Sequence, residues 1–150
     1  MGGLRRRRHH RRPTHRVEAR GQLILAVHLD TNVLLWLSQG RLRSLGEKAC
    51  RLAVRQPWVI SPMVVLELEI LHEIGRIKAG PDQVLAATRE YGTLRVSDLP
   101  LSDVVREACD LSWTRDPIDR LVTAHAIADG TKLLTADKTI LTHFADAVWD

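Results

Sequence analysis

The sequence contains few cysteines and no long apolar run, and both shortages exclude classes of protein. The two cysteines, Cys50 and Cys109, are too few for a disulfide framework and lack the spacing of a metal site. A reducing, cytoplasmic setting fits such a chain best. The longest apolar stretch, residues 23–29, is interrupted by His28 and is far shorter than the roughly 20 residues that a membrane helix needs. These features argue against a membrane protein, a zinc-finger scaffold and a disulfide-rich miniprotein.

The charge of the chain is unevenly distributed along its 150 residues. Residues 1–20 contain eight arginines and one acidic residue, so this segment has a net charge of +7 and the other 130 residues have a net charge of −3. Because the segment also lacks apolar periodicity, we expect residues 1–21 to form a disordered, Arg-rich extension. Two roles stay open for it: non-specific contact with nucleic-acid phosphates, or a plain solvated extension. Residues 22–150 have the size and apolar content of one globular domain.

From residue 22 onward, short apolar runs alternate with helical segments. Strands are expected at 23–29, 58–60, 94–96, 132–135 and 147–149, with helices at 32–38, 44–55, 62–75, 81–92, 102–112, 116–129 and 138–141. Cap residues mark several helix starts, namely Ser44 with Glu47, Ser61 with Pro62, Ser102, and Asp116 with Pro117. Apolar strands separated by helices indicate an α/β fold with three layers and a central, mainly parallel sheet.

Two aspartates follow predicted strands in the same way. Asp30 comes directly after the strand at 23–29, and Asp137 follows the strand at 132–135 after one intervening residue. Each alone fits a common turn or helix cap. Ligands of open parallel sheets bind beyond the carboxyl ends of the strands, so the two aspartates together favour a site at that edge.

Glu67 lies on the apolar side of the predicted helix 62–75. Helical geometry places Met63, Val64 and Ile70 within about 60° of Glu67, whereas Glu69 and Glu73 lie on the opposite side. An unpaired carboxylate in such a place costs several kcal/mol or becomes protonated. An ion pair or a neutral, hydrogen-bonded acid would explain it, and so would a group that faces a metal or a substrate.

Asp119 occupies the third position of the helix that Pro117 opens, where an acid commonly completes a cap with Asp116. If Asp119 joined the three acids above in one pocket, their mutual repulsion would require a cation. Carboxylates are hard oxygen ligands and no Cys/His cluster competes in the sequence, so the expected ion is Mg²⁺ or Mn²⁺. Such ions hold phosphate groups and activate water, which indicates phosphodiester hydrolysis.

Four segments resemble the motif regions of PIN-domain ribonucleases in order and spacing, above all the VapC-type toxins of bacterial toxin–antitoxin systems. They are HLDTNVLLWL (28–37), ISPMVVLELEILHEIGRI (60–77), DPIDRLVTAHAIADG (116–130) and KLLTADKTIL (132–141). The resemblance implies a PIN-like nuclease domain over residues 22–150. The four acids of the family, catalytic and metal-binding, match Asp30, Glu67, Asp119 and Asp137. Supporting positions of the same motifs match Asp116, Asn32 and Thr135.

The same resemblance implies a metal-dependent endoribonuclease. One or two Mg²⁺ or Mn²⁺ ions would be held by the four acids, and an activated water would attack phosphorus in line, leaving 5′-phosphate and 3′-hydroxyl ends. A structured RNA substrate such as tRNA, a homodimer and an inhibitory VapB-type antitoxin that occupies the active-site groove are implied as well.

Other side chains near these motifs have two interpretations each. Arg115 and Arg120 flank the acids and either contact RNA phosphates or are solvated surface residues. His125 lies inside a helix with no second histidine at metal spacing, so a packed histidine is expected rather than a general base. The tryptophans are expected in the core or in dimer contacts rather than as stacking platforms for bases.

Two other classes of function remain as alternatives. A phosphatase or phosphotransferase with Asp30 as nucleophile would also place an aspartate after the first strand, but it usually needs a second aspartate where this chain has Asn32. A non-catalytic module that binds RNA or a protein partner would have no use for the four intact acids. Trapping of a phosphoaspartate and metal-dependent RNA cleavage distinguish the three possibilities.

Overall fold

The computed structural model describes residues 17–19 and 22–150, with side chains from Leu25 onward. The strands are β1 (Val17–Ala19), β2 (Gln22–Ile24), β3 (Val27–Leu29), β4 (Trp58–Ile60), β5 (Leu94–Val96), β6 (Leu133–Leu134) and β7 (Ala147–Val148). The helices are α1 (Thr31–Ser38), α2 (Glu47–Arg55), α3 (Pro62–Glu73), α4 (Pro81–Arg89), α5 (Leu101–Ala108), α6 (Pro117–Asp129) and α7 (Lys138–His143), and the 3₁₀ turn η1 (Leu42–Ser44) precedes α2.

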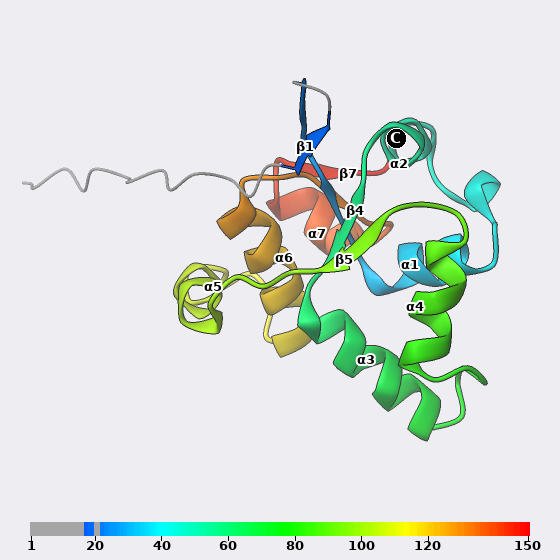
Figure 1. The fold of residues 1–150 in the computed structure, drawn as a ribbon. Helices are drawn as coiled ribbons and strands as arrows, with labels where there is room; N and C mark the ends of the chain where they lie inside the picture. Colours follow the sequence, from blue (N-terminus) through cyan, green and yellow to red (C-terminus); the bar gives the residue numbers. More distant parts are fainter. Residues whose placement is uncertain (1–16, 20–21) are drawn as a thin grey trace, which may run out of the picture.

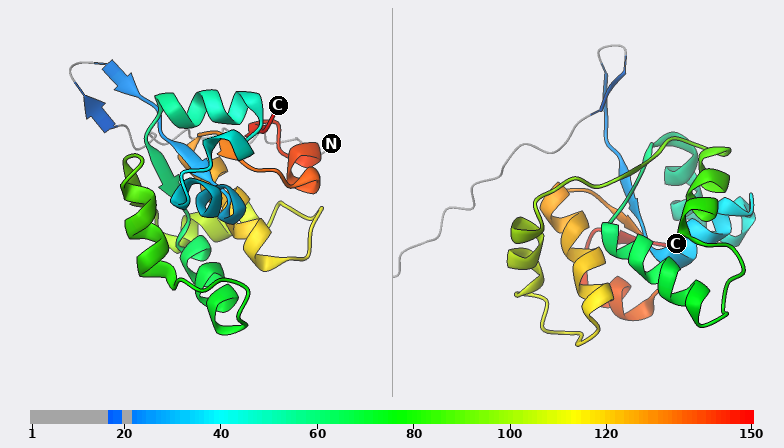
Figure 2. Two further views of the ribbon diagram at one scale, coloured as in Figure 1. Left: turned by 90° about the vertical axis from the view of Figure 1, so that its right-hand side faces the viewer. Right: turned by 60° about the horizontal axis from the view of Figure 1, so that its bottom comes forward.

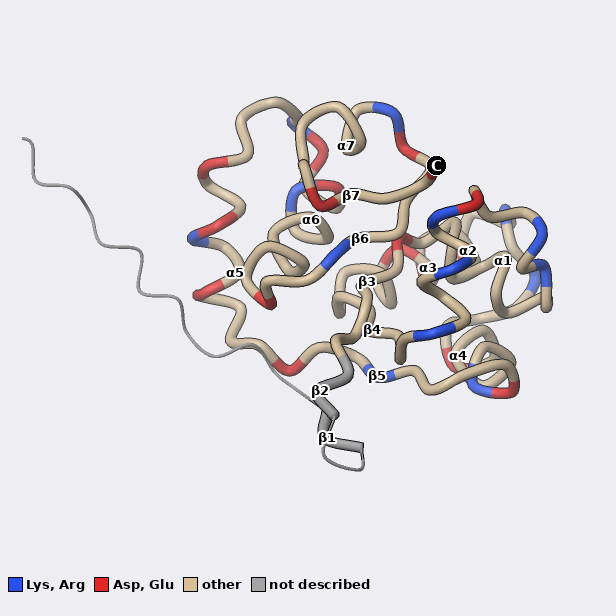
Figure 3. Tube along the Cα trace, turned by 90° about the horizontal axis from the view of Figure 1, so that it is seen from above, with Lys and Arg blue, Asp and Glu red and all other residues tan. Residues whose placement is uncertain are grey.

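A five-stranded parallel sheet forms the centre of the molecule, with the strand order β5-β4-β3-β6-β7. Helices α1, α2 and α4 cover one side of the sheet and α5 and α6 the other, as Figures 1 and 3 show. The α/β expectation with three layers is confirmed. Strand β3 pairs with β4 on one side and β6 on the other, so the chain reverses its direction of winding at β3.

The first strand of the sheet is shorter than the apolar run predicts. The expectation of one buried strand over 23–29 is wrong, because only Val27–Leu29 joins the sheet and Leu25 is 48% exposed. Residues 22–24 belong to β2, which pairs antiparallel with β1. The neighbouring strands begin opposite β3, with Trp58 beside Val27 and Leu133 beside His28, so a longer strand would have no partner there. The predicted extension at 1–21 falls mainly on residues outside the described part, and its residues 17–19 form β1.

Two of the predicted helix caps are confirmed. Ser61 Oγ accepts a hydrogen bond from Met63 N at 3.0 Å at the start of α3. Asp116 Oδ1 accepts from Ile118 N at 2.8 Å and from Asp119 N at 3.1 Å at the start of α6. In both helices a proline follows the cap and presets the first turn.

The other two predicted caps are wrong. Helix α2 begins at Glu47, whose N–H donates to Asp150 Oδ1 at 2.7 Å, and Ser44 belongs to η1. The end of the chain lies against this helix start, where a Cβ on Gly46 would come within 2.4 Å of Trp149 O. Helix α5 begins after Pro100 without a side-chain cap, so Ser102 is already inside it.

The core lies on both sides of the sheet. Its fully buried members include the strand residues Leu29, Ile60, Leu133 and Leu134 and the helix residues Val33, Leu34, Leu37, Val64, Leu68, Val122 and Ile140. Burial of these side chains is the main favourable contribution to folding. No helix within the described residues is both long and apolar enough to cross a membrane.

Candidate active site

The carboxyl edge of the sheet at β3 holds two of the expected acids. Asp30 follows β3, and its backbone N–H donates to Leu134 O at 3.0 Å, which places it beside the end of β6. The buried Thr135 donates from Oγ1 to Asp30 Oδ2 at 2.7 Å and accepts from Asp137 N at 3.0 Å. Thr135 therefore connects Asp30 and Asp137 at the point where the strand order reverses. This is the place in an open parallel sheet where ligands bind.

Both aspartates also begin a helix. Asp30 Oδ1 accepts from Thr31 N at 2.8 Å and caps α1. Asp137 Oδ1 accepts from Ile140 N at 2.9 Å and caps α7. The cap interpretation is confirmed for both residues, and their place at the carboxyl edge of the sheet leaves the site interpretation open.

Glu67 reaches the same region from α3. Thr31 Oγ1 donates a short hydrogen bond to Glu67 Oε2, so the residue after Asp30 joins the two acids. Thr31 is 3% exposed, and the sequence interpretation assigned it no role. The sequence signal that could have indicated a role for Thr31 is its hydroxyl group directly after the first acid, Asp30. No basic side chain in the described part of the chain forms an ion pair with Glu67.

The apolar face on which the sequence places Glu67 is only partly buried. Helix α3 buries Val64 and Leu68, whereas Ile70 and Ile74 on the predicted apolar face are 40% and 62% exposed. Glu67 is half-buried at the border between these two faces. Helical periodicity grouped the apolar residues correctly but could not show which of them face the core.

Asp116 and Asp119 lie together in the first turn of α6. The Asp116 backbone N–H donates to Thr114 Oγ1 at 3.1 Å, and Asp116 itself is exposed. The pKa of Asp119 is raised to about 6, chiefly by burial and then by the carboxylates of Asp116, Asp30, Asp137 and Glu67, in that order. The electrostatic influence of all four neighbours on one aspartate shows that the structure brings the predicted acids together.

Two other acids in the cluster are shifted in the same direction. Burial raises the pKa of Asp30, and the Asp137 carboxylate adds to the effect, while the hydrogen bonds from Thr135 and Thr31 oppose it. Burial likewise raises the pKa of Glu67, with contributions from Asp30 and Asp116, and the Thr31 hydrogen bond opposes it. Burial and mutual repulsion exceed the hydrogen bonds, so the cluster favours anything that supplies positive charge.

The donor chemistry of the cluster fits a hard divalent cation. All of the side chains are carboxylates, the ligands that Mg²⁺ and Mn²⁺ prefer. Among the described residues, however, no three His, Cys, Asp or Glu side chains stand close enough to hold a metal ion as they are oriented. Carboxylate oxygens of Asp30 and Glu67 face threonine hydroxyls instead. Side-chain rotation at the same backbone positions would be needed to form the ligand set.

The remaining predicted site residues lie around the cluster. Asn32 is exposed on α1. Arg115 Nη1 donates to Ser112 O at 2.6 Å, and Arg120 Nε donates to Thr114 O at 2.8 Å, so both guanidinium groups support the segment that leads into α6. Trp113 in that segment stacks on His143 of α7, with ring centroids 5.1 Å apart and an interplanar angle of 8°. The loop is thereby attached to α7, whose N-cap is Asp137.

The other tryptophans have structural surroundings. Trp58 is 4% exposed and its Nε1–H donates to Ala53 O at 2.9 Å. The ring centroids of Trp36 and Trp149 are 5.6 Å apart.

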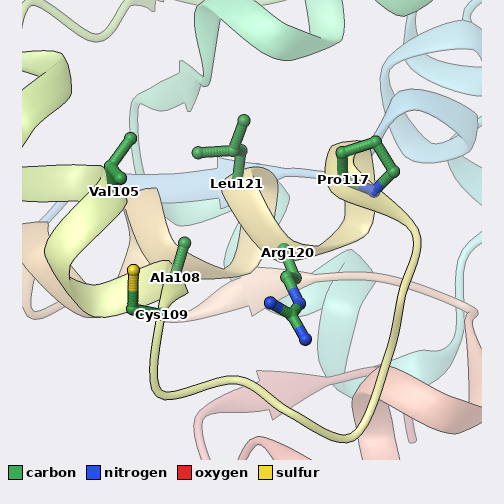
Figure 4. Close-up of a pocket in the computed structure, with 6 residues that line it drawn as sticks. All are labelled: Val105, Ala108, Cys109, Pro117, Arg120 and Leu121. Atoms are coloured by element: carbon green, nitrogen blue, oxygen red, sulfur yellow. The ribbon is translucent and has the colours of Figure 1, made fainter.

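An apolar pocket of about 230 Å³ lies between α5 and α6, outside the acidic cluster. Figure 4 shows its lining, formed by Val105, Ala108, Cys109, Pro117, Arg120 and Leu121.

The right-hand view of Figure 2 brings the carboxyl edge of the sheet forward, where α3, α6 and α7 come together. Solved structures of other proteins share this fold. The structure is similar to VapBC2 from Rickettsia felis bound to a DNA fragment from the promoter, with a TM-score of 0.60, 19% identity, and coverage of 84% of this chain and 100% of that chain. It is also similar to VapBC-1 from nontypeable Haemophilus influenzae, with a TM-score of 0.56, 17% identity, and coverage of 84% and 97%. No curated protein matches the sequence at a significant level. The family model of the PIN domain matches residues 27–146, and the chain therefore belongs to the PIN domain family.

Proposed function

We propose that this PIN-domain protein is a VapC-type toxin, a metal-dependent endoribonuclease that hydrolyses RNA phosphodiester bonds. The observation that carries the proposal is the convergence of Asp30, Glu67, Asp119 and Asp137 at the reversal point of the sheet. Burial and neighbouring carboxylates raise the pKa of Asp30, Glu67 and Asp119, and no basic side chain of the described residues pairs with the four acids. A divalent cation would compensate the charge of such a cluster and would bind the oxygens of a phosphodiester as well.

In this proposal the four acids hold one or two Mg²⁺ or Mn²⁺ ions. When bound, the cation lowers the pKa of a water molecule and offsets the charge of the phosphate. Before the cation binds, Thr31 and Thr135 hold Glu67 and Asp30 through their hydroxyl groups. Asp116 holds the first turn of α6 in place, and Asn32 lies at the exposed side of the cluster. Arg115 and Arg120 supply positive charge for the RNA phosphates at the rim.

The likeness to VapBC complexes supports a VapB-type antitoxin as the protein partner. A homodimer is proposed as well, because α3 presents Leu66, Ile70 and Ile74 with exposed fractions of 48%, 40% and 62%. Isolated apolar side chains on a surface are ordinary, but three at a spacing of four residues along α3 and its C-cap form an apolar stripe that a second copy would cover. The mass of the protein in solution tests this part of the proposal.

The deciding experiment is cleavage of total RNA and of purified tRNA by the full chain. Cleavage is expected with Mg²⁺ or Mn²⁺, with 5′-phosphate and 3′-hydroxyl ends on the fragments, and is expected to stop in EDTA. Undiminished cleavage in EDTA would remove the metal from the proposal. A trapped phosphoaspartate at Asp30 would point to phosphotransfer, and intact RNA under all conditions would point to a binding module.

A further inference from the structure

A group of polar side chains is buried under the acidic cluster, in the interior of the domain. Its members are His28, Ser61, His125 and Asp129, with exposed fractions of 0%, 0%, 1% and 3%. We refer to them as the buried polar group. Polar and charged side chains are rarely buried so completely unless they are paired, so a group of four calls for a physical explanation.

The group consists of two hydrogen-bonded pairs. His28 Nε2 on β3 donates to Asp129 Oδ2 at the end of α6, at 2.6 Å. His125 Nδ1 lies 3.0 Å from Leu121 O and 2.9 Å from Ser61 Oγ. A carbonyl oxygen can only accept, so Nδ1 carries the proton and donates to both oxygens. The two imidazole rings lie 6.3 Å apart between centroids, so the pairs are neighbours.

The hydrogen bonding of the group is incomplete. His28 Nδ1 and Asp129 Oδ1 have no partner among the described residues. Buried atoms of this kind destabilise a protein, and apolar side chains of similar size would avoid the penalty. Core stability alone therefore gives no reason for this choice of residues.

Each element of the group carries one of the proposed metal ligands. His28 lies two residues before Asp30 in the same chain segment. Ser61 is the N-cap of α3, which carries Glu67, and His125 is on α6, which carries Asp119. Directional hydrogen bonds between β3, α3 and α6 thus connect the supports of three acids, whereas apolar contacts would allow these elements to slide or rotate.

We propose that the buried polar group is a positioning device that fixes β3, α3 and α6 relative to one another, so that Asp30, Glu67 and Asp119 stay at the spacing needed to hold a divalent cation. This inference rests on the proposed function. The four residues touch neither the cation nor the RNA, and they act through the carboxylates. The side-chain rotation that metal binding requires then takes place on supports that do not move.

The main test is the double variant H28L/D129A in the full chain. It removes both members of one pair at a similar total volume and leaves neither group buried alone. We expect a melting temperature near that of the wild type without metal. We also expect the affinity for Mn²⁺, measured from the free-ion signal in electron paramagnetic resonance, and kcat for RNA to fall by about tenfold or more, with KM unchanged. The exposed His72 provides the control H72L, which is expected to match the wild type in each measurement.

A second pair of variants tests the other hydrogen bond. In H125N the side-chain amide nitrogen takes the place of Nδ1 and keeps the donor, whereas H125L removes it. We expect H125L to lose Mn²⁺ affinity and kcat and H125N to restore most of both. Loss in both variants would show that the donor is not what matters and would overturn the assignment of Ser61 and His125.

The outcomes separate this inference from the proposed function. A wild type that neither binds Mn²⁺ nor cleaves RNA would end the proposed function and the inference with it. A wild type that does both, together with a folded H28L/D129A variant that binds and cleaves equally well, would overturn the inference alone. If the double variant failed to fold, wild-type Mn²⁺ affinity and kcat in H125L would overturn it equally.

Discussion

Asp30 is held by two donors, one at each carboxylate oxygen. Thr31 N donates to Oδ1 and Thr135 Oγ1 donates to Oδ2, and these bonds favour the ionised form. Burial acts more strongly in the opposite direction, and the pKa of Asp30 is raised. The charge at this position is therefore costly in the metal-free protein, and a bound cation would recover that cost.

We expect D30N to reduce RNA cleavage by at least about 100-fold, the scale of losing a major electrostatic contribution. The fold should persist, because an asparagine oxygen can still accept the hydrogen bond from Thr31 N. Cleavage rates and circular dichroism check the two parts of this prediction. D82N, which removes an exposed acid from the first turn of α4, is the control. Wild-type turnover in D30N would reduce Asp30 to a helix cap.

Glu67 distinguishes a ligand from a structural acid. If it belongs to the metal site, E67Q relieves repulsion, and the metal-free melting temperature should stay equal or rise. The rise in melting temperature on adding Mn²⁺ should become smaller, because the folded variant binds the ion more weakly. RNA cleavage should fall by at least about 100-fold. E69Q and E73Q on the same helix are matched controls that should change neither quantity much. A metal-free E67Q protein that melts far below the wild type would favour a structural role.

The pH dependence of stability is expected to depend on Asp119. Its pKa in the folded protein is about 6, against an ordinary value of 3.8, chiefly because of burial. The folded state therefore binds this proton more tightly than the unfolded chain does. The resulting stability is present below about pH 4 and is lost as the pH rises through about 6. Melting temperatures in EDTA from pH 4 to 7 should fall more steeply for the wild type than for D119N, and parallel curves would contradict the assignment.

At the level of helices and strands, the sequence predicted the features that depend on adjacent residues and missed those that depend on contacts distant in sequence. The caps at Ser61 and Asp116 were predictable because cap, proline and first turn are adjacent in sequence. The start of α2 was not, because its N-terminal N–H bonds to Asp150, 103 residues away. The same limit applies to the first strand, whose length is set by β4 and β6.

In the candidate site, too, some residues could be predicted from the sequence and others could not. Asp30 and Asp137 could be assigned to one sheet edge because parallel strands end together. The orientation of Glu67 could not, since Leu66 and Ile70 of α3 face solvent and periodicity does not separate them from the apolar residues in the core. Thr31 was missed because its partner is 36 residues away and a hydroxyl group is not diagnostic in sequence.

Helix α2 offers a test of the long-range cap. Replacing a capping side chain by alanine costs about 1 kcal/mol, with the lower half of the range expected at an exposed site. D150A should therefore lower the free energy of unfolding by up to about 1 kcal/mol, while S44A, at the position that the sequence pattern favoured, should have no effect. Urea denaturation of the two variants checks this, and equal destabilisation would contradict the observed cap.

At the scale of the whole molecule, charge is separated into two parts. The segment 1–20 has a net charge of +7 and the other 130 residues a net charge of −3, and the acidic cluster belongs to the latter. An acidic nuclease site repels its polyanionic substrate until cations are bound. Positive charge elsewhere in the chain, in the N-terminal segment, can therefore contribute to RNA affinity independently of the chemistry.

Deletion of residues 1–21 tests this separation. All four motif segments and the matched PIN domain lie after residue 26, so kcat for metal-dependent cleavage should stay within about twofold of the full chain. RNA affinity should fall and become less dependent on salt, because each phosphate contact to single-stranded RNA adds about 0.7 to the slope of log K against log salt. Filter binding and cleavage at several salt concentrations, with the full chain beside the truncated one, measure both effects. A truncated protein that folds but has lost kcat would show that the segment contributes to the site itself. An unchanged salt slope would show that its arginines do not contact the RNA.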